Sequence, residues 1–435
     1  NFFKTMTQQK KSYLLPIAMM FALFAMISFV TGLPAPFGVI VQNQFGATNF
    51  QATLGFAANF IAYFFMGIPS GMLLQKIGYK KTALIAILVG FTGVGVQALA
   101  SQAGPDYGFT VYLSGAFISG FSMCMLNAVV NPMLNTLGGG GKKGNQLIQA
   151  GGTLNSISAT IVPVLVGYLM GTVVEERTIA KALPALYIAM AIFAVAFLVL
   201  FFMQIPEPRL EKTAKTKTKD PHSPLSFRHF ILGAVAIFVY VGVEVGIPHF
   251  ANLFMTTQAG GGLAIDTTIA GSVVGTYWFL MMIGRLTGAS LGAKFSSKAM
   301  LTFASSLGLI LVAGAIFLPT TIHVSMPVFQ SDISFGMAQV PVNIMLLILC
   351  GLCTSIMWGG ILNLAVEGLG KYTEAASGIF MVMVCGGGLL PLLQGGVADS
   401  LGFLSSYWVI FIAFAYMLYY ALIGCKNVNK NIPVE

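Results

Sequence analysis

The stretch EPRLEKTAKTKTKDPHSPLSFRH, residues 207–229, is the longest polar run in a chain that is otherwise dominated by apolar residues. Apolar segments of about 20 residues precede it and follow it, and a helix needs about this length to span a bilayer. Six such segments fit on each side of the polar run. The run therefore divides the chain into two groups of six predicted membrane helices joined by one polar linker.

The composition agrees with a polytopic membrane protein. Apolar residues make up 57% of the 435 residues and charged residues only 8%, with a mean hydropathy of +0.85. Soluble domains carry about a quarter charged residues, so a soluble enzyme, a nucleic-acid-binding protein, a secreted disulfide scaffold and a coiled coil are excluded. We predict an all-α fold with twelve spans at 14–41, 51–75, 82–102, 109–137, 146–172, 182–204, 228–256, 266–292, 298–319, 340–369, 372–401 and 404–425.

Three units follow from these spans. They are an N-terminal bundle (1–204), a cytoplasmic linker (205–227) and a C-terminal bundle (228–435). The stretch 320–340 is expected to be a longer outside loop that could carry a short helix at the rim.

The basic residues predict the orientation of the chain. Of 22 Lys and Arg residues, 20 lie in clusters at 4–11, 76–81, 142–143, 209–228, 285–298, 371 and 426–430. Uncharged or acidic turns separate these clusters. Because cytoplasmic loops carry the excess of basic residues, both termini and the linker are predicted to be cytoplasmic. The net charge of +9 then reflects topology and not an acidic partner.

The two halves share sequence features. Gly67-Ile-Pro-Ser-Gly71 and Gly284-Arg-Leu-Thr-Gly288 are both GxxxG pairs that run into a basic turn. The stretch NPMLNTLG at 131–138 aligns with NLAVEGLG at 363–370. Parallel repeats of six helices are what the major facilitator architecture requires, and its substrates are held at mid-membrane between the halves.

Several motifs resemble the fucose and glucose/galactose permease branch of the major facilitator superfamily. They are Thr48-Asn-Phe-Gln-Ala52, Tyr240-Val-Gly-Val-Glu-Val-Gly246, Gly284-Arg-Leu-Thr-Gly288, Ser355-Ile-Met with Leu364-Ala-Val-Glu-Gly-Leu-Gly370, and Gly386-Gly-Gly-Leu-Leu-Pro-Leu-Leu-Gln-Gly395 before Ala398-Asp399. The resemblance implies a protein that imports monosaccharides across a bacterial inner membrane, commonly with a proton and in some members with sodium.

Two acidic positions of that family are replaced in this chain. Family members usually carry an Asn-Asp pair in the first helix, with the Asp thought to couple to the proton, whereas this chain reads Leu33-Pro-Ala35-Pro. The Glu of the fourth helix in fucose-type members falls on Asn127. The resemblance also matches Asn155 to a family Asn implicated in sugar binding. Coupling in this chain would therefore need another acid.

Glu244 is the best candidate for that acid. Among the thirteen acidic residues it alone lies in the middle of a predicted span. An ionised carboxylate at that depth costs on the order of several kcal/mol, so the side chain should face a cavity. Proton coupling, acceptance of a sugar hydroxyl, or both would use it. A protonated Glu in a helix–helix hydrogen bond is the structural alternative.

Amides and aromatic rings make up the rest of the predicted sugar site. Amide side chains offer paired donors and acceptors to hydroxyl groups, and aromatic faces suit the apolar face of a pyranose. Interhelical hydrogen bonds and packing are the competing explanations. The predicted substrate-binding residues are Asn127, Asn131, Gln149, Asn155, Tyr240, Glu244, Trp278, Trp358, Asn363 and Gln394.

Arg285 is predicted to gate the protein on its cytoplasmic side. It lies at the inner end of the eighth predicted span, where a long side chain can extend toward the headgroups, and the resemblance suggests a gating or stabilising contact there. With no basic residue left in mid-membrane, an anionic substrate is disfavoured. The histidines, His222, His229, His249 and His323, lie near predicted ends or loops, so we expect no catalytic constellation and no metal or cofactor site.

The sequence thus predicts a secondary transporter that imports a neutral monosaccharide, such as glucose, galactose or fucose, by alternating access. A proton coupled through Glu244 is the favoured driving ion. The alternatives are a facilitator, a sodium-coupled carrier, an exporter of another small polar solute, or a non-transporting sugar sensor. The expected partners are the sugar, a proton or sodium ion and the lipid bilayer, with no nucleic acid, and the protein is expected to be a monomer.

Overall fold

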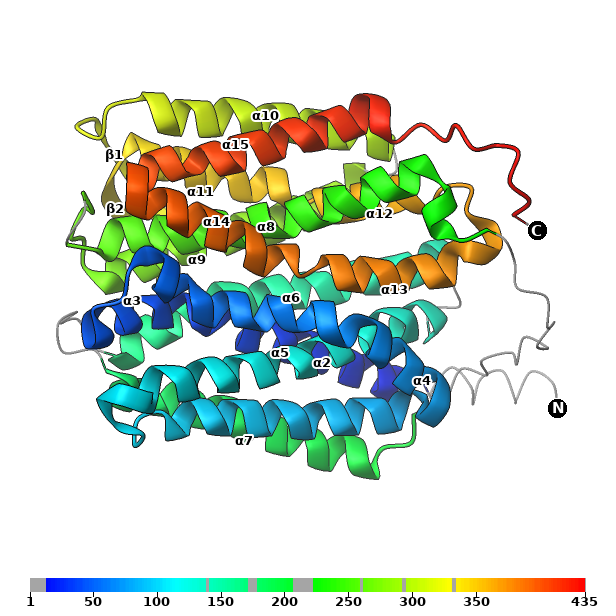
Figure 1. Cartoon of the computed structure of the whole chain (residues 1–435), viewed down its shortest axis with the longest axis horizontal. Helices are drawn as coiled ribbons and strands as arrows, with labels where there is room; N and C mark the ends of the chain where they lie inside the picture. The colour runs from blue at the N-terminus through cyan, green and yellow to red at the C-terminus, as the bar shows by residue number, and fades with distance from the viewer. Residues whose placement is uncertain are drawn as a thin grey trace.

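The computed structural model describes residues 13–137, 141–170, 178–205, 222–258, 261–291, 295–330 and 334–434. Long helices run side by side along one axis, with their connections at two ends (Figure 1). Most of the predicted linker 205–227, namely 206–221, lies outside the described residues.

The first half of the chain builds six rods. Helices α2 (Leu14–Gly32) and α3 (Pro34–Phe45) form one rod, α4 (Asn49–Leu99) provides two, and α5 (Gly104–Leu137), α6 (Gly141–Met170) and α7 (Ile179–Phe202) provide one each. The chain turns back within α4 at Gly78, whose φ of 82° and ψ of 175° are not helical. The sequence places this reversal in the basic turn Gln75–Lys81.

The second half repeats the arrangement. After the short turn η2 (Pro224–Ser226) come α8 (Arg228–Thr256), α9 (Thr267–Leu291), α10 (Ser297–Phe317), strands β1 (His323–Phe329) and β2 (Phe335–Pro341), α11 (Val342–Thr354), α12 (Met357–Val366), η3 (Gly370–Tyr372), α13 (Thr373–Met383), α14 (Gly386–Leu401), α15 (Phe403–Tyr419) and the π-helical turn η4 (Tyr420–Gly424). Helices α2–α7 fill one half of the bundle and α8–α15 the other (Figure 1).

The prediction of a helical membrane bundle is confirmed. Within the described residues, eleven helices are long and apolar enough to cross a membrane. Helix α6, with 30 residues, is a further helix that runs parallel to them (Figure 1). The predicted spans agree with the helices to within a few residues, and the predicted span 228–256 coincides with α8.

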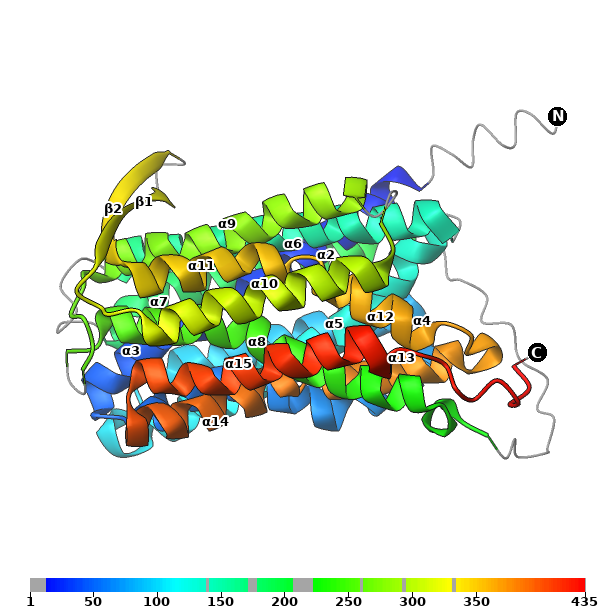
Figure 2. The same ribbon diagram turned by 90° about the horizontal axis from the view of Figure 1, so that it is seen from above.

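The expectation of a rim helix within 320–340 is wrong, because this stretch forms a β-hairpin. Strands β1 and β2 pair antiparallel from His323–Pro341 to Phe329–Phe335. Alternate residues are buried, namely Met326, Val328, Ala338 and Val340, which is the period-two pattern of a strand. The strands stand at one end of the bundle (Figure 2), which we call the hairpin end. The opposite end, where the described C-terminal residues lie, is called the terminus end (Figure 1).

Three rods are interrupted inside the bundle. Helices α2 and α3 meet at Leu33, α11 and α12 are separated by Ser355 and Ile356, and α13 and α14 by Val384 and Cys385. Irregular backbone at membrane depth is tolerated where protein buries it. Gly284 and Gly288 of α9 face Ser355 and Ile356, so the GxxxG pair lets α9 approach the α11–α12 break closely.

Two sets of helices bring the halves together. Helix α6 packs on α9, and α4 packs on α13 and α14. Gly387 and Gly388 of α14 lie against Phe60 and Ala57 of α4, and small residues of this kind allow helix backbones to approach in membranes. The α6–α9 contact contains the candidate site.

The reversal of α4 at Gly78 gives a test of the fold. Gly78→Ala should lower the free energy of unfolding by about 1–3 kcal/mol, because this backbone conformation is strained for any residue with a Cβ. Gly71→Ala is the matched control, since Gly71 lies in the helical part of α4 and an added Cβ would meet nothing within 4 Å. Thermal unfolding of both variants in detergent measures the difference. Equal melting temperatures for the two variants would contradict this interpretation of the turn.

Candidate functional site

Glu244 and Arg285 form an ion pair inside the bundle. The Oε1 atom of Glu244 on α8 lies 3.1 Å from Nη2 of Arg285 on α9, and each side chain is 15% exposed. A charged residue within a membrane-spanning segment is costly and usually pairs with another or faces a cavity. The predicted mid-span acid therefore has a basic partner, Arg285, whose side chain the sequence analysis directed toward the headgroups.

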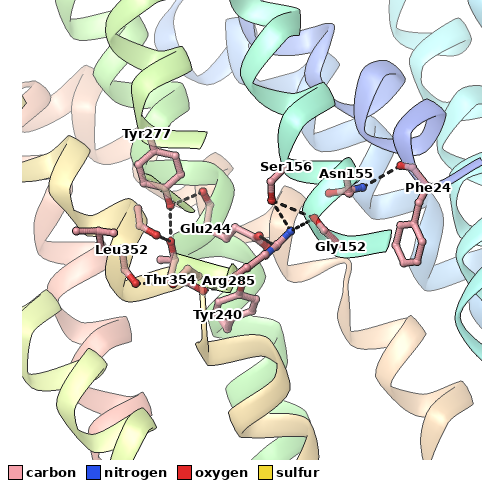
Figure 3. Close-up of polar contacts among 12 residues, drawn as sticks. Phe24, Gly152, Asn155, Ser156, Tyr240, Glu244, Tyr277, Arg285, Leu352 and Thr354 are labelled. Carbon is pink, nitrogen blue, oxygen red and sulfur yellow. Dashed lines mark hydrogen bonds and ion pairs between the residues drawn. The ribbon is translucent and has the colours of Figure 1, made fainter. Parts of the chain in front are cut away.

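Arg285 also joins the two halves of the protein. Its Nη1 atom donates to the carbonyl oxygen of Gly152 at 2.9 Å and to Oγ of Ser156 at 2.7 Å, both on α6 (Figure 3). The Ser156 hydroxyl donates to the same Gly152 carbonyl at 3.1 Å, which leaves its oxygen lone pairs for the guanidinium. One side chain thus holds Glu244 in its own half and α6 in the other half.

The expectation that Arg285 extends toward the headgroups is wrong. The position of its Cα near one end of the span was correct, but the long side chain turns toward the interior, where a carboxylate and two oxygens of α6 satisfy it. The premise that no basic group reaches mid-membrane therefore fails as well. The preference for a neutral substrate is instead supported by the pair itself, which carries no net charge.

Tyrosine hydroxyls connect this pair to the break between α11 and α12. Tyr277 donates to the backbone carbonyl of Glu244 at 2.9 Å and lies 3.0 Å from Oγ1 of Thr354, while Tyr240 donates to the carbonyl of Thr354 at 3.1 Å (Figure 3). Both rings are fully buried. The two tyrosines therefore fix the end of α11 against α8 and α9.

Three of the predicted substrate-binding amides form hydrogen bonds within the first half. Asn127 donates to the hydroxyl of Tyr63 at 2.8 Å and to the carbonyl of Met123, and Asn131 donates to the carbonyl of Asn127 at 3.0 Å. Asn155 donates to the carbonyl of Phe24 on α2 at 3.1 Å (Figure 3). These are the interhelical and local hydrogen bonds of the competing explanation, so a sugar-binding role for the three amides stays a prediction.

The remaining predicted residues lie in different places. Trp358 contacts Tyr240 with ring centroids 6.1 Å apart, and Trp278 packs edge-on against Tyr277 at 5.2 Å. Gln394 is fully buried between α14 and α15, where it donates to Ser406 at 3.3 Å. Asn363 is exposed on α12. Gln149 belongs to α6, and its side chain lies outside the described part of the chain.

A small cavity lies between the halves. Its volume is about 50 Å³, and its lining comes from α2, α4, α6, α8 and α9: Ser28, Thr31, Gly32, Phe56, Ala159, Val245, Pro248, His249, Val274 and Trp278. A water molecule needs about 10–15 Å³ by this measure, so the cavity can take a few waters and is too small for a monosaccharide. Trp278 is a predicted substrate-binding residue that lines it.

At the hairpin end, Asp399 of α14 joins the N-terminus of α4 in the other half. Its two carboxylate oxygens accept hydrogen bonds from the backbone N–H of Asn49 at 2.9 Å and of Phe50 at 3.0 Å. Thr48 caps the next amide, that of Gln51. The first amides of a helix have no partner within the helix and attract negative charge, so this carboxylate closes the two halves against each other.

Further contacts between the halves lie near Asp399. The Thr53 hydroxyl is 3.2 Å from Nε2 of His249, and Thr257 donates to Gln42 at 3.2 Å. Sequence reasoning missed Asp399 and His249 because both were treated as residues of loops or span ends. The signal was present for His249, which lies about two turns inside the predicted span 228–256. Within the described residues, no group of three or more His, Cys, Asp and Glu could hold a metal ion.

Comparisons with known proteins agree with this architecture. The family model described as Major Facilitator Superfamily matches residues 19–390. The chain is 28% identical over 428 residues to a protein of Brucella abortus biovar 1 (strain 9-941) named glucose/galactose transporter, with 97% of each chain covered. It is 24% identical over 421 residues to the L-fucose-proton symporter of Escherichia coli (strain K12), with 91% of this chain and 89% of that protein covered.

A solved structure has the same fold. The crystal structure of a Major Facilitator Superfamily transporter, FucP, in the outward conformation superposes with a TM-score of 0.66 at 21% sequence identity. The superposition covers 94% of this chain and 98% of that chain.

The ion pair can be tested by its effect on stability in two backgrounds. Arg285→Gln should lower the free energy of unfolding by about 3–5 kcal/mol, because it leaves a buried carboxylate without a partner. Glu244→Gln should destabilise the wild-type protein but stabilise the Arg285→Gln variant, since it then removes the unpaired charge. Thermal unfolding of the two single variants and the double variant in detergent measures both effects. If Glu244→Gln lowers the melting temperature equally in both backgrounds, the pair is not energetically coupled.

The Asp399 contact predicts that the hairpin end opens when the carboxylate is neutralised. In a Thr53→Cys background, Asp399→Asn should raise the rate at which a membrane-impermeant maleimide labels position 53, because an amide binds the two backbone N–H groups more weakly than a carboxylate. Ser400→Ala is the matched control, since the Ser400 hydroxyl bonds only to carbonyls of its own helix. Equal labelling rates in the two variants would show that Asp399 does not hold this end closed.

Proposed function

The chain belongs to the major facilitator superfamily, and from this premise we propose that it is a secondary transporter for a neutral monosaccharide. Members of this superfamily are transporters and not enzymes. The observation that carries the proposal is the Glu244–Arg285 pair, which lies where the halves meet and whose arginine donates hydrogen bonds across to α6. Transport would move the sugar through the bilayer by alternating access, with hexoses and deoxyhexoses such as glucose, galactose and fucose as substrates.

The substrate class is supported by charge and by relatives. The ion pair contributes no net charge to the space between the halves, which favours an uncharged solute over an anion or a cation. The cavity between the halves offers Trp278 and Phe56 as aromatic faces and His249 as a polar group. Relatives that align over nearly the whole chain are named glucose/galactose transporter and L-fucose-proton symporter.

Coupling to a proton would use Glu244. Protonation of its carboxyl group removes the charge that holds Arg285 Nη2, so the guanidinium keeps its bonds to Gly152 and Ser156 and loses its partner on α8. The balance between contacts within one half and contacts across the two halves then shifts. A protein that carries its proton on Glu244 does not need the family acids replaced by Ala35 and Asn127.

The clusters of Lys and Arg support an orientation of the protein in the membrane. We infer that the terminus end faces the cytoplasm of a bacterial cell and that the protein is a multi-pass monomer of the inner membrane. The units 1–204 and 228–435 would then rock against each other around the linker 205–227. In that frame the contacts of Asp399 and His249 close the outer side, and the cavity has to widen before a monosaccharide can enter.

Uptake into proteoliposomes tests the proposal. Purified protein is reconstituted, and entry of labelled glucose, galactose and fucose is measured with and without an inward proton gradient. The wild-type protein should accumulate at least one of these sugars when the gradient is present. Equilibration that ignores the gradient would indicate a facilitator, and accumulation driven only by sodium would indicate a sodium-coupled carrier. Absence of uptake of every sugar would contradict the proposed substrate class.

Glu244→Gln tests the coupling step separately. This variant should lose proton-driven accumulation but retain exchange of labelled for unlabelled sugar, because the amide cannot take up and release a proton. Glu367→Gln is the matched control, since Glu367 lies on the same half with an exposed side chain at the terminus end. Proton-driven accumulation at the wild-type level in Glu244→Gln would exclude Glu244 as the coupling acid.

A further inference from the structure

His249 is a buried histidine that takes no part in the hydrogen bonds described above for Glu244 and Arg285. It lies on α8 and is 1% exposed. Its ring stacks on Phe56 of α4 with centroids 5.0 Å apart and packs edge-on against Phe250. It also lines the cavity between the halves, together with Phe56 and Trp278.

The hydrogen bonds of Thr53 determine which ring nitrogen of His249 carries the proton. The Thr53 hydroxyl lies 2.7 Å from the carbonyl oxygen of Asn49, to which it donates its one hydrogen. Thr53 can therefore only accept from His249, whose Nε2 is 3.2 Å away. Nε2 therefore carries a proton. Because a charged ring buried without a counter-charge would be costly, the imidazole is the neutral form, in which Nδ1 is an acceptor.

The Nδ1 atom has no hydrogen-bond partner, although the residue is buried. Buried polar atoms in proteins nearly always have a partner, and an unpaired one calls for an explanation such as a water or a ligand. The cavity that His249 lines has room for a few waters. A hydroxyl group is the donor that could take the place of such a water on a neutral acceptor.

We propose that Nδ1 of His249 accepts a hydrogen bond from a hydroxyl group of the transported monosaccharide, an inference that rests on the proposed function. Phe56 and Trp278 would lie against the apolar faces of the sugar ring, while Nδ1 selects the hydroxyl. The same imidazole holds Thr53 of the other half through Nε2. One side chain would therefore contact both the substrate and the closure of the hairpin end.

Two isosteric variants separate the roles of the two nitrogens. The amide oxygen of Asn lies close to the position of Nδ1, so His249→Asn keeps an acceptor at that position. His249→Gln instead places its amide nitrogen near Nε2 and removes that acceptor. His229→Gln is the matched control, because His229 is also buried on α8 with an unpartnered Nδ1 but is not among the residues that line the cavity.

Equilibrium binding of glucose, galactose and their monodeoxy analogues to the purified proteins is the measurement. His249→Gln should weaken binding of the parent sugar by about three- to tenfold, the effect of one lost neutral hydrogen bond. For the analogue that lacks the contacting hydroxyl, wild type and His249→Gln should have the same Kd. His249→Asn should retain the wild-type discrimination against that analogue, and His229→Gln should match the wild type throughout.

Two results would overturn the assignment while leaving the proposed function intact. The first is an unchanged Kd for every sugar in His249→Gln. The second is a loss of affinity by one common factor for all analogues, which would mean that His249 only packs. A wild-type protein that binds and transports none of these sugars would instead refute the proposed function, and the assignment of His249 would fall with it.

Discussion

The structure depends on one electrostatic constraint, which is the placement of two opposite charges in the low-dielectric interior of a membrane bundle. Either Glu244 or Arg285 alone would be costly there, and together they carry no net charge. The guanidinium has more donors than one carboxylate can satisfy, so its remaining hydrogen bonds reach α6 in the other half. The need to satisfy a buried arginine thus links the chemistry of one half to the position of the other.

The break between α11 and α12 lies beside these charges and is held by the same group of residues. The break between α11 and α12 leaves the carbonyl of Thr354 without a continuous helix after it, and Tyr240 donates to that carbonyl. Tyr277 holds the side chain of Thr354 and the backbone of Glu244 together. Two fully buried tyrosines therefore keep the interrupted rod in register with the helix that carries the acid, which a regular helix would not need.

Much of the fold could be predicted from the sequence, and the site only in part. Span positions follow from hydropathy, and Glu244 stands out because it is the only acid in mid-span. The side chain of Arg285 could not be placed, because its length allows either the headgroups or the interior. The partners of Asn127 and Asn155 depend on helices far away in sequence. The β-hairpin was missed because its alternation is confined to two strands of seven residues each.

The contact of Asp399 with α4 has a consequence for how this protein can change by mutation. The groups that Asp399 binds are backbone amides, and every residue except proline supplies one at positions 49 and 50. Substitutions at these two positions by residues other than proline therefore leave both N–H groups available to Asp399, whereas replacement of Asp399 by an apolar residue removes both hydrogen bonds at once. Mutational tolerance across this contact is one-sided, with all of the constraint on the carboxylate.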